Sequence, residues 1–281
     1  MRAHILLNGG DLQRSPKSTA RTHCRRDRRS RLRCCALAAA ALVSVCLGAP
    51  RAETSWRDIE SRIQYGYYTE DAPALRSLED SVAADESHDR LHGYYAGLLS
   101  WRLAQLAAHS RAAAQGGSTA QLAQRCVNEV DGALAVQADF AEALALRAAC
   151  LATPLEANGW HAFYAVNRAR RDIGRALQLA ARNPRVLLLD AMSDYQLSPE
   201  IGGNKERALV KLRQAVAAFE AERADTEQLP GWGAAEAYLL LARDLLDHGE
   251  PVMARDALEH SLLIAPEFAQ ARRLIAQITS G

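Results

Sequence analysis

The stretch EAYLLLARDLLDHGEPVMARDALEHSLLIAPEFAQARRLIAQI, residues 236–278, decides the fold of this 281-residue chain. Its first apolar residues recur at spacings of three and four, which places them on one face of a helix: Tyr238, Leu241, Ala242 and Leu245. That pattern stops before Gly249, which can take the left-handed conformation that ends many helices. Pro251 then stands early in a second helix, where its missing N–H costs least. The stretch therefore predicts two helices joined by a tight turn.

The second predicted helix has an apolar face of its own, which ends at Ala265–Pro266 because proline disfavours helix at the residue before it. In spacing and residue type the hairpin resembles a tetratricopeptide repeat, a motif of about 34 residues with an aromatic residue, leucine, small residues and a closing proline. The matching positions are Tyr238, Leu241, Ala242, Leu245, Gly249, Ala254, Leu258, Ser261 and Pro266. A further first helix, with Phe268 and Ala271 at its start, has no partner after it and is expected to cap the array.

The same junction occurs upstream. Phe140-Ala-Glu-Ala stands where Phe268-Ala-Gln-Ala stands in the last repeat, each shortly after an apolar helix. Helical patterns also cover Trp56 to Tyr67, Ala72 to Val82, Thr119 to Val136 and Trp160 to Arg182, and strand patterns are almost absent. Together with the resemblance, they imply an all-α, right-handed solenoid over residues 53–281, with about five helical hairpins plus a C-terminal capping helix.

Residues 1–52 have the composition of a leader rather than of a repeat. They carry 11 basic and 2 acidic residues, and the apolar run Cys34 to Leu47 leads into a small-residue stretch ending at Ala52. This order is typical of a Sec-type secretory signal peptide with a long basic region. One alternative is an uncleaved envelope anchor. The other is a start codon assigned too far upstream, so that part of this stretch is not translated. Weaker variants are a twin-arginine signal at Arg28–Arg29 and a lipobox ending at Cys46. We therefore expect an exported, periplasmic protein.

The basic residues of the leader offset an excess of acidic residues in the rest of the chain. The whole chain has 34 basic and 33 acidic residues, so residues 53–281 keep 23 basic and 31 acidic residues, a net charge of −8. Nucleic acid and anionic membrane surfaces are therefore not expected as partners. The excess of acidic residues also agrees with simple solubility of a helical protein.

Two cysteines remain after the leader, Cys126 and Cys150, on helices that should pack against each other. In an oxidising compartment such a pair predicts a disulfide. The alternative is two buried thiols that act as small apolar residues.

Signals for catalysis or cofactors are weak. His88 and His92 lie four residues apart, as two metal ligands on a helix could, but no third ligand accompanies them. The sequence has no nucleophile elbow, zinc-protease helix or phosphate loop. We expect no enzyme activity, no cofactor and no metal.

Aromatic residues concentrate in two places, and a solenoid's concave face favours such side chains for binding a peptide or helix. The candidates for contact with a protein or peptide partner are Tyr65, Tyr67, Tyr68, Tyr94, Tyr95, Trp101, Trp160 and Tyr164. Aromatic residues at this spacing are also typical of a helical core.

The function predicted from the sequence is a non-catalytic protein-interaction scaffold of the periplasm or cell envelope. The alternative is a small-molecule-binding accessory component of a transport system. It follows from the loop Ser198 to Asn204, whose Pro-x-x-Gly-Gly pattern resembles a loop in the T-components of some solute transporters.

Overall fold

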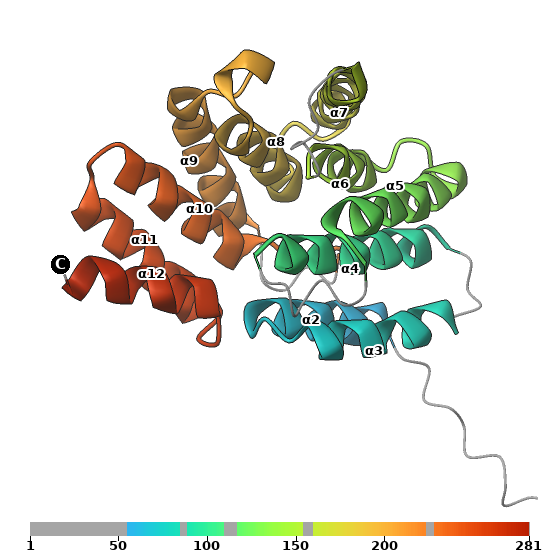
Figure 1. Ribbon diagram of the computed structural model, residues 1–281, viewed down its shortest axis with the longest axis horizontal. Coiled ribbons are helices and arrows are strands. Elements are labelled where there is room, and N and C mark those ends of the chain that lie inside the picture. Colours follow the sequence, from blue (N-terminus) through green and yellow to red (C-terminus); the bar gives the residue numbers. More distant parts are fainter. Residues whose placement is uncertain (1–54, 85–88, 110–116, 154–159, 223–227, 281) are drawn as a thin grey trace, which may run out of the picture. The chain divides into compact units, whose positions relative to one another are not determined.

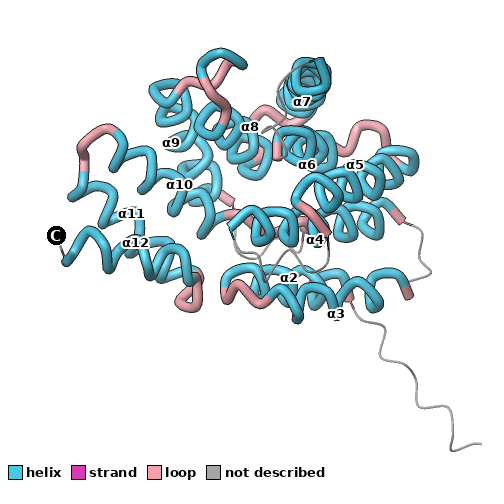
Figure 2. The backbone as a smooth tube through the Cα atoms, viewed as in Figure 1, coloured by secondary structure: helices cyan, strands magenta, loops and turns pink. Residues whose placement is uncertain are grey.

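Helices make up nearly all the regular structure of the folded chain. The structure, a computed structural model, describes residues 55–84, 89–109, 117–153, 160–222 and 228–280. These residues contain eleven α-helices, one short 3-10 helix and no strand (Figure 2). The helices are α2 (Trp56–Tyr68), α3 (Ala72–Ala83), α4 (Arg90–His109), α5 (Thr119–Val136), α6 (Ala141–Ala152), α7 (Trp160–Leu179), α8 (Pro184–Gln196), η2 (Pro199–Ile201), α9 (Lys205–Ala221), α10 (Ala234–Asp247), α11 (Pro251–Ile264) and α12 (Ala269–Ser280).

Local sequence explains where these helices begin and end. Ser118 and Gln121 form a capping box at the start of α5, and the Asn183 side chain accepts from backbone N–H groups of α8 just before Pro184. Gly249 adopts φ 76° between α10 and α11, and Pro251 opens α11. The turn predicted for the C-terminal hairpin is confirmed.

The eleven helices form five hairpins and a final helix, so the predicted all-α solenoid is confirmed. The hairpins are α2/α3, α4/α5, α6/α7, α8/α9 and α10/α11, and α12 packs on α11 (Figure 1). First helices of successive hairpins also touch, since α2 contacts α4, α4 contacts α6, α6 contacts α8 and α8 contacts α10. The first helices thus line the inner side of the array, as in a tetratricopeptide-type fold.

One cross-link joins neighbouring hairpins. Cys126 on α5 and Cys150 on α6 form a disulfide with their Cα atoms 6.1 Å apart. Both side chains are fully buried, so the bridge lies inside the packed interface between the two helices.

The connection before α10 contains a buried tryptophan. Trp232 is 1% exposed and packs on Trp101 of α4, with ring centroids 5.9 Å apart. Gly233 follows at φ 117°, and a Cβ there would lie 2.7 Å from Phe219. Glycine is thus needed to turn the chain from the buried tryptophan into α10.

Residues 1–52, predicted to be the leader, lie outside the described residues. The compact helical unit comprises residues Thr54–Gly281. Along the part of the chain with described structure, no helix has both the length and the apolar character needed to cross a bilayer.

Candidate functional site

The last hairpin and α12 return to the first hairpin. Phe268, at the start of α12, packs against Tyr68 of α2, with ring centroids 4.5 Å apart. Arg273 of α12 pairs with Glu70, which follows α2, across 203 positions of sequence. We call this line of contacts the seam. The first and last repeats therefore meet along the seam, and the inner side of the array stays partly open to solvent.

A buried ion pair lies beside the seam. Arg102 of α4 and Glu236 of α10 are 1% and 5% exposed, and a guanidinium nitrogen of Arg102 bonds Glu236 Oε1. The Tyr68 hydroxyl donates to Glu236 Oε2 at 2.7 Å. Burial and the Glu236 carboxylate raise the pKa of Tyr68 well above its ordinary value, so its hydroxyl keeps its proton.

Aromatic rings surround the Arg102 guanidinium. Its central carbon lies 4.0 Å from the ring centroid of Tyr67 and 4.8 Å from the centroids of Trp101 and Trp232. Cation–π contacts of this kind partly replace the hydration that burial removes. The aromatic residues therefore hold a charge inside the array.

A second buried carboxylate fixes the loop that carries Trp232. Glu60 of α2 accepts from the Tyr95 hydroxyl at 2.7 Å and from the Gly231 N–H at 2.9 Å. Trp232 Nε1 donates to the Tyr94 hydroxyl at 2.8 Å. Burial raises the pKa of Glu60, although the bonds from Gly231 and Tyr95 act in the opposite direction.

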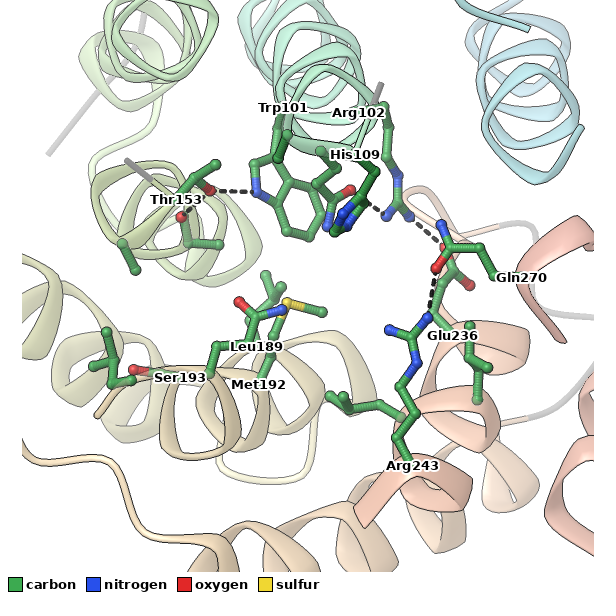
Figure 3. A pocket seen from close by; sticks show the side chains of 18 of the residues that line it. Trp101, Arg102, His109, Thr153, Leu189, Met192, Ser193, Glu236, Arg243 and Gln270 are labelled. Carbon is green, nitrogen blue, oxygen red and sulfur yellow. Dashed lines mark hydrogen bonds and ion pairs between the residues drawn. The ribbon is translucent and has the colours of Figure 1, made fainter. Parts of the chain in front are cut away.

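The inner side of the array contains a cavity of about 430 Å³, which we call the central cavity (Figure 3). Helices α4, α6, α8 and α10 and the start of α12 supply its walls. The apolar part includes Trp101, Leu189, Met192, Leu239, Leu240 and Phe268, and the polar part includes Arg102, Gln105, His109, Thr153, Ser193, Glu236, Arg243 and Gln270. This mixture of apolar surface and a few convergent polar groups is typical of a small-molecule site.

The charges of the lining do not cancel. Arg102 and Glu236 neutralise each other, whereas Arg243 donates to the amide oxygen of Gln270 at 2.8 Å (Figure 3). In the described parts of the chain, no carboxylate forms an ion pair with Arg243. Counting arginine and carboxylate side chains, the lining keeps one positive charge, on Arg243.

The Gly-Gly loop singled out in the sequence borders the same cavity. Ser198 and Ile201 belong to the lining, and Arg170 and Arg207 donate to the carbonyl oxygens of Ile201 and Gly202 at 2.7 and 2.8 Å. The loop is thus held in place by neighbouring helices and forms part of the wall.

The predicted partner-binding aromatics do not form one surface. Tyr94 and Tyr95 are fully buried, and Tyr67, Tyr68 and Trp101 are at most 6% exposed, so none of these five offers a free face to a partner. Tyr67 and Trp101 nevertheless line the central cavity. Tyr65 and Tyr164 are exposed at 60% and 67%, and the Trp160 side chain lies outside the described residues. The expectation fails for the buried residues because their neighbours in the fold cover them: Tyr95 packs on Trp56, Tyr94 on Phe140, and Tyr68 on Phe268.

Sequence reasoning missed Arg243, Glu236 and Trp232. Arg243 and Glu236 lie in a clearly helical segment, where a charged residue is normally read as solvated surface. Glu236 meets Arg102 and Tyr68, 134 and 168 positions away, and Arg243 meets Gln270, 27 positions away, so no local signal reports these contacts.

Metal binding has no support in the described parts. They contain no group of three or more His, Cys, Asp or Glu side chains arranged to hold a metal ion. His88, half of the histidine pair considered above, lies outside them.

Comparison with known proteins supports the fold alone. No protein-family description matches the chain, and no curated protein matches it. Among solved structures, the HusA haemophore from Porphyromonas gingivalis is similar over 72% of this chain and 96% of its own, with 20% sequence identity and a TM-score of 0.54. A crystal structure of MamA is also similar, over 58% of this chain and 80% of its own, with 16% identity and a TM-score of 0.39.

Proposed function

We propose that this protein is a non-catalytic binding protein for small amphipathic molecules, which it holds in the central cavity. The observation that carries the proposal is the central cavity on the concave side of the solenoid, whose mixed apolar and polar wall includes Phe268 of the seam. A volume of about 430 Å³ lies within the usual range of ligand sites.

This proposal replaces the open scaffold as the leading function. A scaffold of this fold binds a peptide or helix along an accessible concave face. Here Tyr94, Tyr95 and Trp232 fill much of that face with core. The transport-accessory function inferred from the Gly-Gly loop agrees better with the geometry, since Ser198 and Ile201 of that loop line the cavity.

A fluorescent probe tests the proposal directly. N-phenyl-1-naphthylamine is neutral and brightens in apolar sites, so the mature protein should bind it saturably with one site. Ser193→Phe, which places a ring in the cavity wall, should abolish this binding. Ser77→Phe is the matched control, since Ser77 is exposed on α3 and lines no cavity.

Equal binding by both variants would contradict the central cavity as the site, and no binding by the wild type would favour the scaffold function. HusA is named a haemophore. Haemin therefore belongs in the panel of competing ligands.

We also propose that the protein acts outside the cytoplasm. The basic leader followed by an apolar run supports this, as does the disulfide between Cys126 and Cys150, because disulfides persist in oxidising compartments. Expression of the full chain in a bacterial host, followed by fractionation and N-terminal sequencing, should find a periplasmic protein that starts near Ala52. A cytoplasmic protein with an intact leader would contradict export.

A further inference from the structure

Among the described residues, Arg243 differs from the other charged groups of the central cavity in having no carboxylate partner. Arg102 has Glu236, with further support from Tyr68 and three aromatic rings. Within the same residues, Arg243 bonds only the neutral amide of Gln270, whose Oε1 accepts one of its five N–H groups at 2.8 Å. The remaining donor capacity of the guanidinium is therefore free to meet an acceptor that a ligand supplies.

The position of Arg243 suits that role. Arg243, His109 and Gln270 line both the central cavity and an adjoining cavity of about 330 Å³, which also includes Glu70 and Arg273 of the seam. Arg243 therefore stands where the two cavities adjoin. The apolar surface of Leu189, Met192 and Leu239 belongs to the central cavity alone.

The charge of this site is opposite to that of the chain around it. Residues 53–281 carry a net charge of −8, with 23 basic and 31 acidic residues, yet the central cavity keeps one positive charge. A partly buried guanidinium favours a carboxylate or sulfonate, because it can donate two parallel hydrogen bonds to such a group.

We infer that the ligand is an amphipathic monoanion, whose single acidic group is bound by Arg243 and whose apolar body lies against the partly exposed apolar side chains of the cavity wall, such as Leu197 and Ile201. This inference rests on the proposed binding function and adds the chemical class of the ligand. Gln270 positions the guanidinium through its amide oxygen, and the ion pair between Arg102 and Glu236 forms the neutral polar part of the wall.

Two matched probes distinguish recognition of the acidic group by Arg243 from binding in the central cavity as such. The anionic probe is 8-anilino-1-naphthalenesulfonate, and the neutral probe is N-phenyl-1-naphthylamine, which has the same aromatic rings without the sulfonate. Arg243→Gln should raise the Kd of the anionic probe about tenfold or more and change the Kd of the neutral probe little. Arg243→Lys keeps the charge and should lose less affinity for the anion than Arg243→Gln.

A second variant leaves Arg243 in place. Gln270→Glu puts a carboxylate at the amide that now accepts from Arg243, so the variant supplies an internal counterion that competes with the ligand. Gln270→Glu should raise the Kd of the anionic probe as much as Arg243→Gln does, and the Kd of the neutral probe should again change little. The control is Arg213→Gln, which removes one positive charge from an exposed position on α9 that lines none of the cavities.

Competition extends the test from sulfonate to carboxylate. Octanoate should displace the neutral probe from the wild type at lower concentrations than 1-octanol does, and Arg243→Gln should remove that difference. The role of Arg243 would be overturned if folded Arg243→Gln and Gln270→Glu lost affinity for both probes equally. It would also be overturned if neither variant lost affinity for the anionic probe. Failure of both probes to bind the wild type would instead overturn the binding function itself.

Discussion

Glu70 and Arg273 form an ion pair across the seam, with Arg273 Nη1 2.9 Å from Glu70 Oε2 and 203 positions of sequence between them. The Arg273 side chain is 56% exposed, so water and salt screen the pair. We expect Arg273→Ala to lower the free energy of unfolding by no more than about 1 kcal/mol. Urea denaturation followed by circular dichroism measures this, with the exposed neighbour Arg272→Ala as control. A much larger loss would mean that the pair, rather than the apolar contact of Phe268, holds the seam.

The backbone of Glu70 gives a second prediction. Its φ of 59° lies in the left-handed region, in the turn where the last hairpin has Gly249 at φ 76°. Glu70→Ala should lose the ion pair and keep the backbone strain, whereas Glu70→Gly should lose the ion pair and relieve the strain. We therefore expect the glycine variant to be more stable than the alanine variant by about 1 kcal/mol in urea denaturation. Equal stabilities would show that the turn relaxes when the carboxylate is removed.

Loss of one partner from the buried pair of Arg102 and Glu236 should lower the free energy of unfolding far more. Glu236→Ala leaves a guanidinium that is 1% exposed without its carboxylate, which typically costs about 3–5 kcal/mol. Replacement of both partners, as Arg102→Met with Glu236→Leu, should cost less than Glu236→Ala alone, because no charge stays buried. Thermal and urea denaturation of both variants provide the comparison. A double variant less stable than the single one would contradict this account.

The disulfide should stabilise the interface between α5 and α6. Cys126 and Cys150 are 24 positions apart, and closing a loop of that length reduces unfolded-state entropy by an amount worth about 3 kcal/mol. Reduction should therefore lower the melting temperature, and Cys126→Ala with Cys150→Ala should reproduce the loss without reductant. Mass measurement after alkylation, with and without reductant, checks the bridge itself. Two free thiols in protein from the periplasm would contradict it.

The burial of Asp244 predicts that its contribution to the free energy of unfolding depends on pH. The residue is fully buried, and neither carboxylate oxygen has a hydrogen-bond partner among the described residues, although His248 Nδ1 lies 3.4 Å from Oδ1. Burial raises the pKa of Asp244, with His248 acting in the opposite direction. The native state therefore binds this proton more tightly than the unfolded chain does. The stabilisation from protonation is present at low pH and is lost as pH rises through the native pKa.

Asp244→Asn should accordingly be more stable than the wild type at pH 7, by about 1 kcal/mol, and this advantage should shrink as the pH falls. Asp247→Asn is the opposite case. Burial acts to raise the pKa of Asp247, but hydrogen bonds from Lys205 and Tyr195 lower it overall, so that variant should lose stability at pH 7. Urea denaturation between pH 4 and pH 8 distinguishes the two. A destabilised Asp244→Asn at pH 7 would contradict the argument.

The helices were predictable because their signals are local. Gly249 and Pro251 mark one turn, and the spacing of Tyr238 and Leu241 marks one face, so hairpins can be read a few residues at a time. The site was not predictable in the same way. Tyr94 and Tyr95 have the same helical spacing whether they face a partner or a core, and contacts distant in sequence decide between the two. Tyr94 accepts a hydrogen bond from Trp232, 138 positions away, and Tyr95 packs on Trp56.

An open solenoid tolerates a change in its number of repeats, because each repeat touches only its neighbours. The seam removes that freedom here. Deletion of a middle hairpin would shift the direction of the last one, and Glu236 would no longer meet Arg102, nor Phe268 meet Tyr68. The contacts across the seam thus depend on the number of hairpins, whereas the contacts of an open solenoid do not.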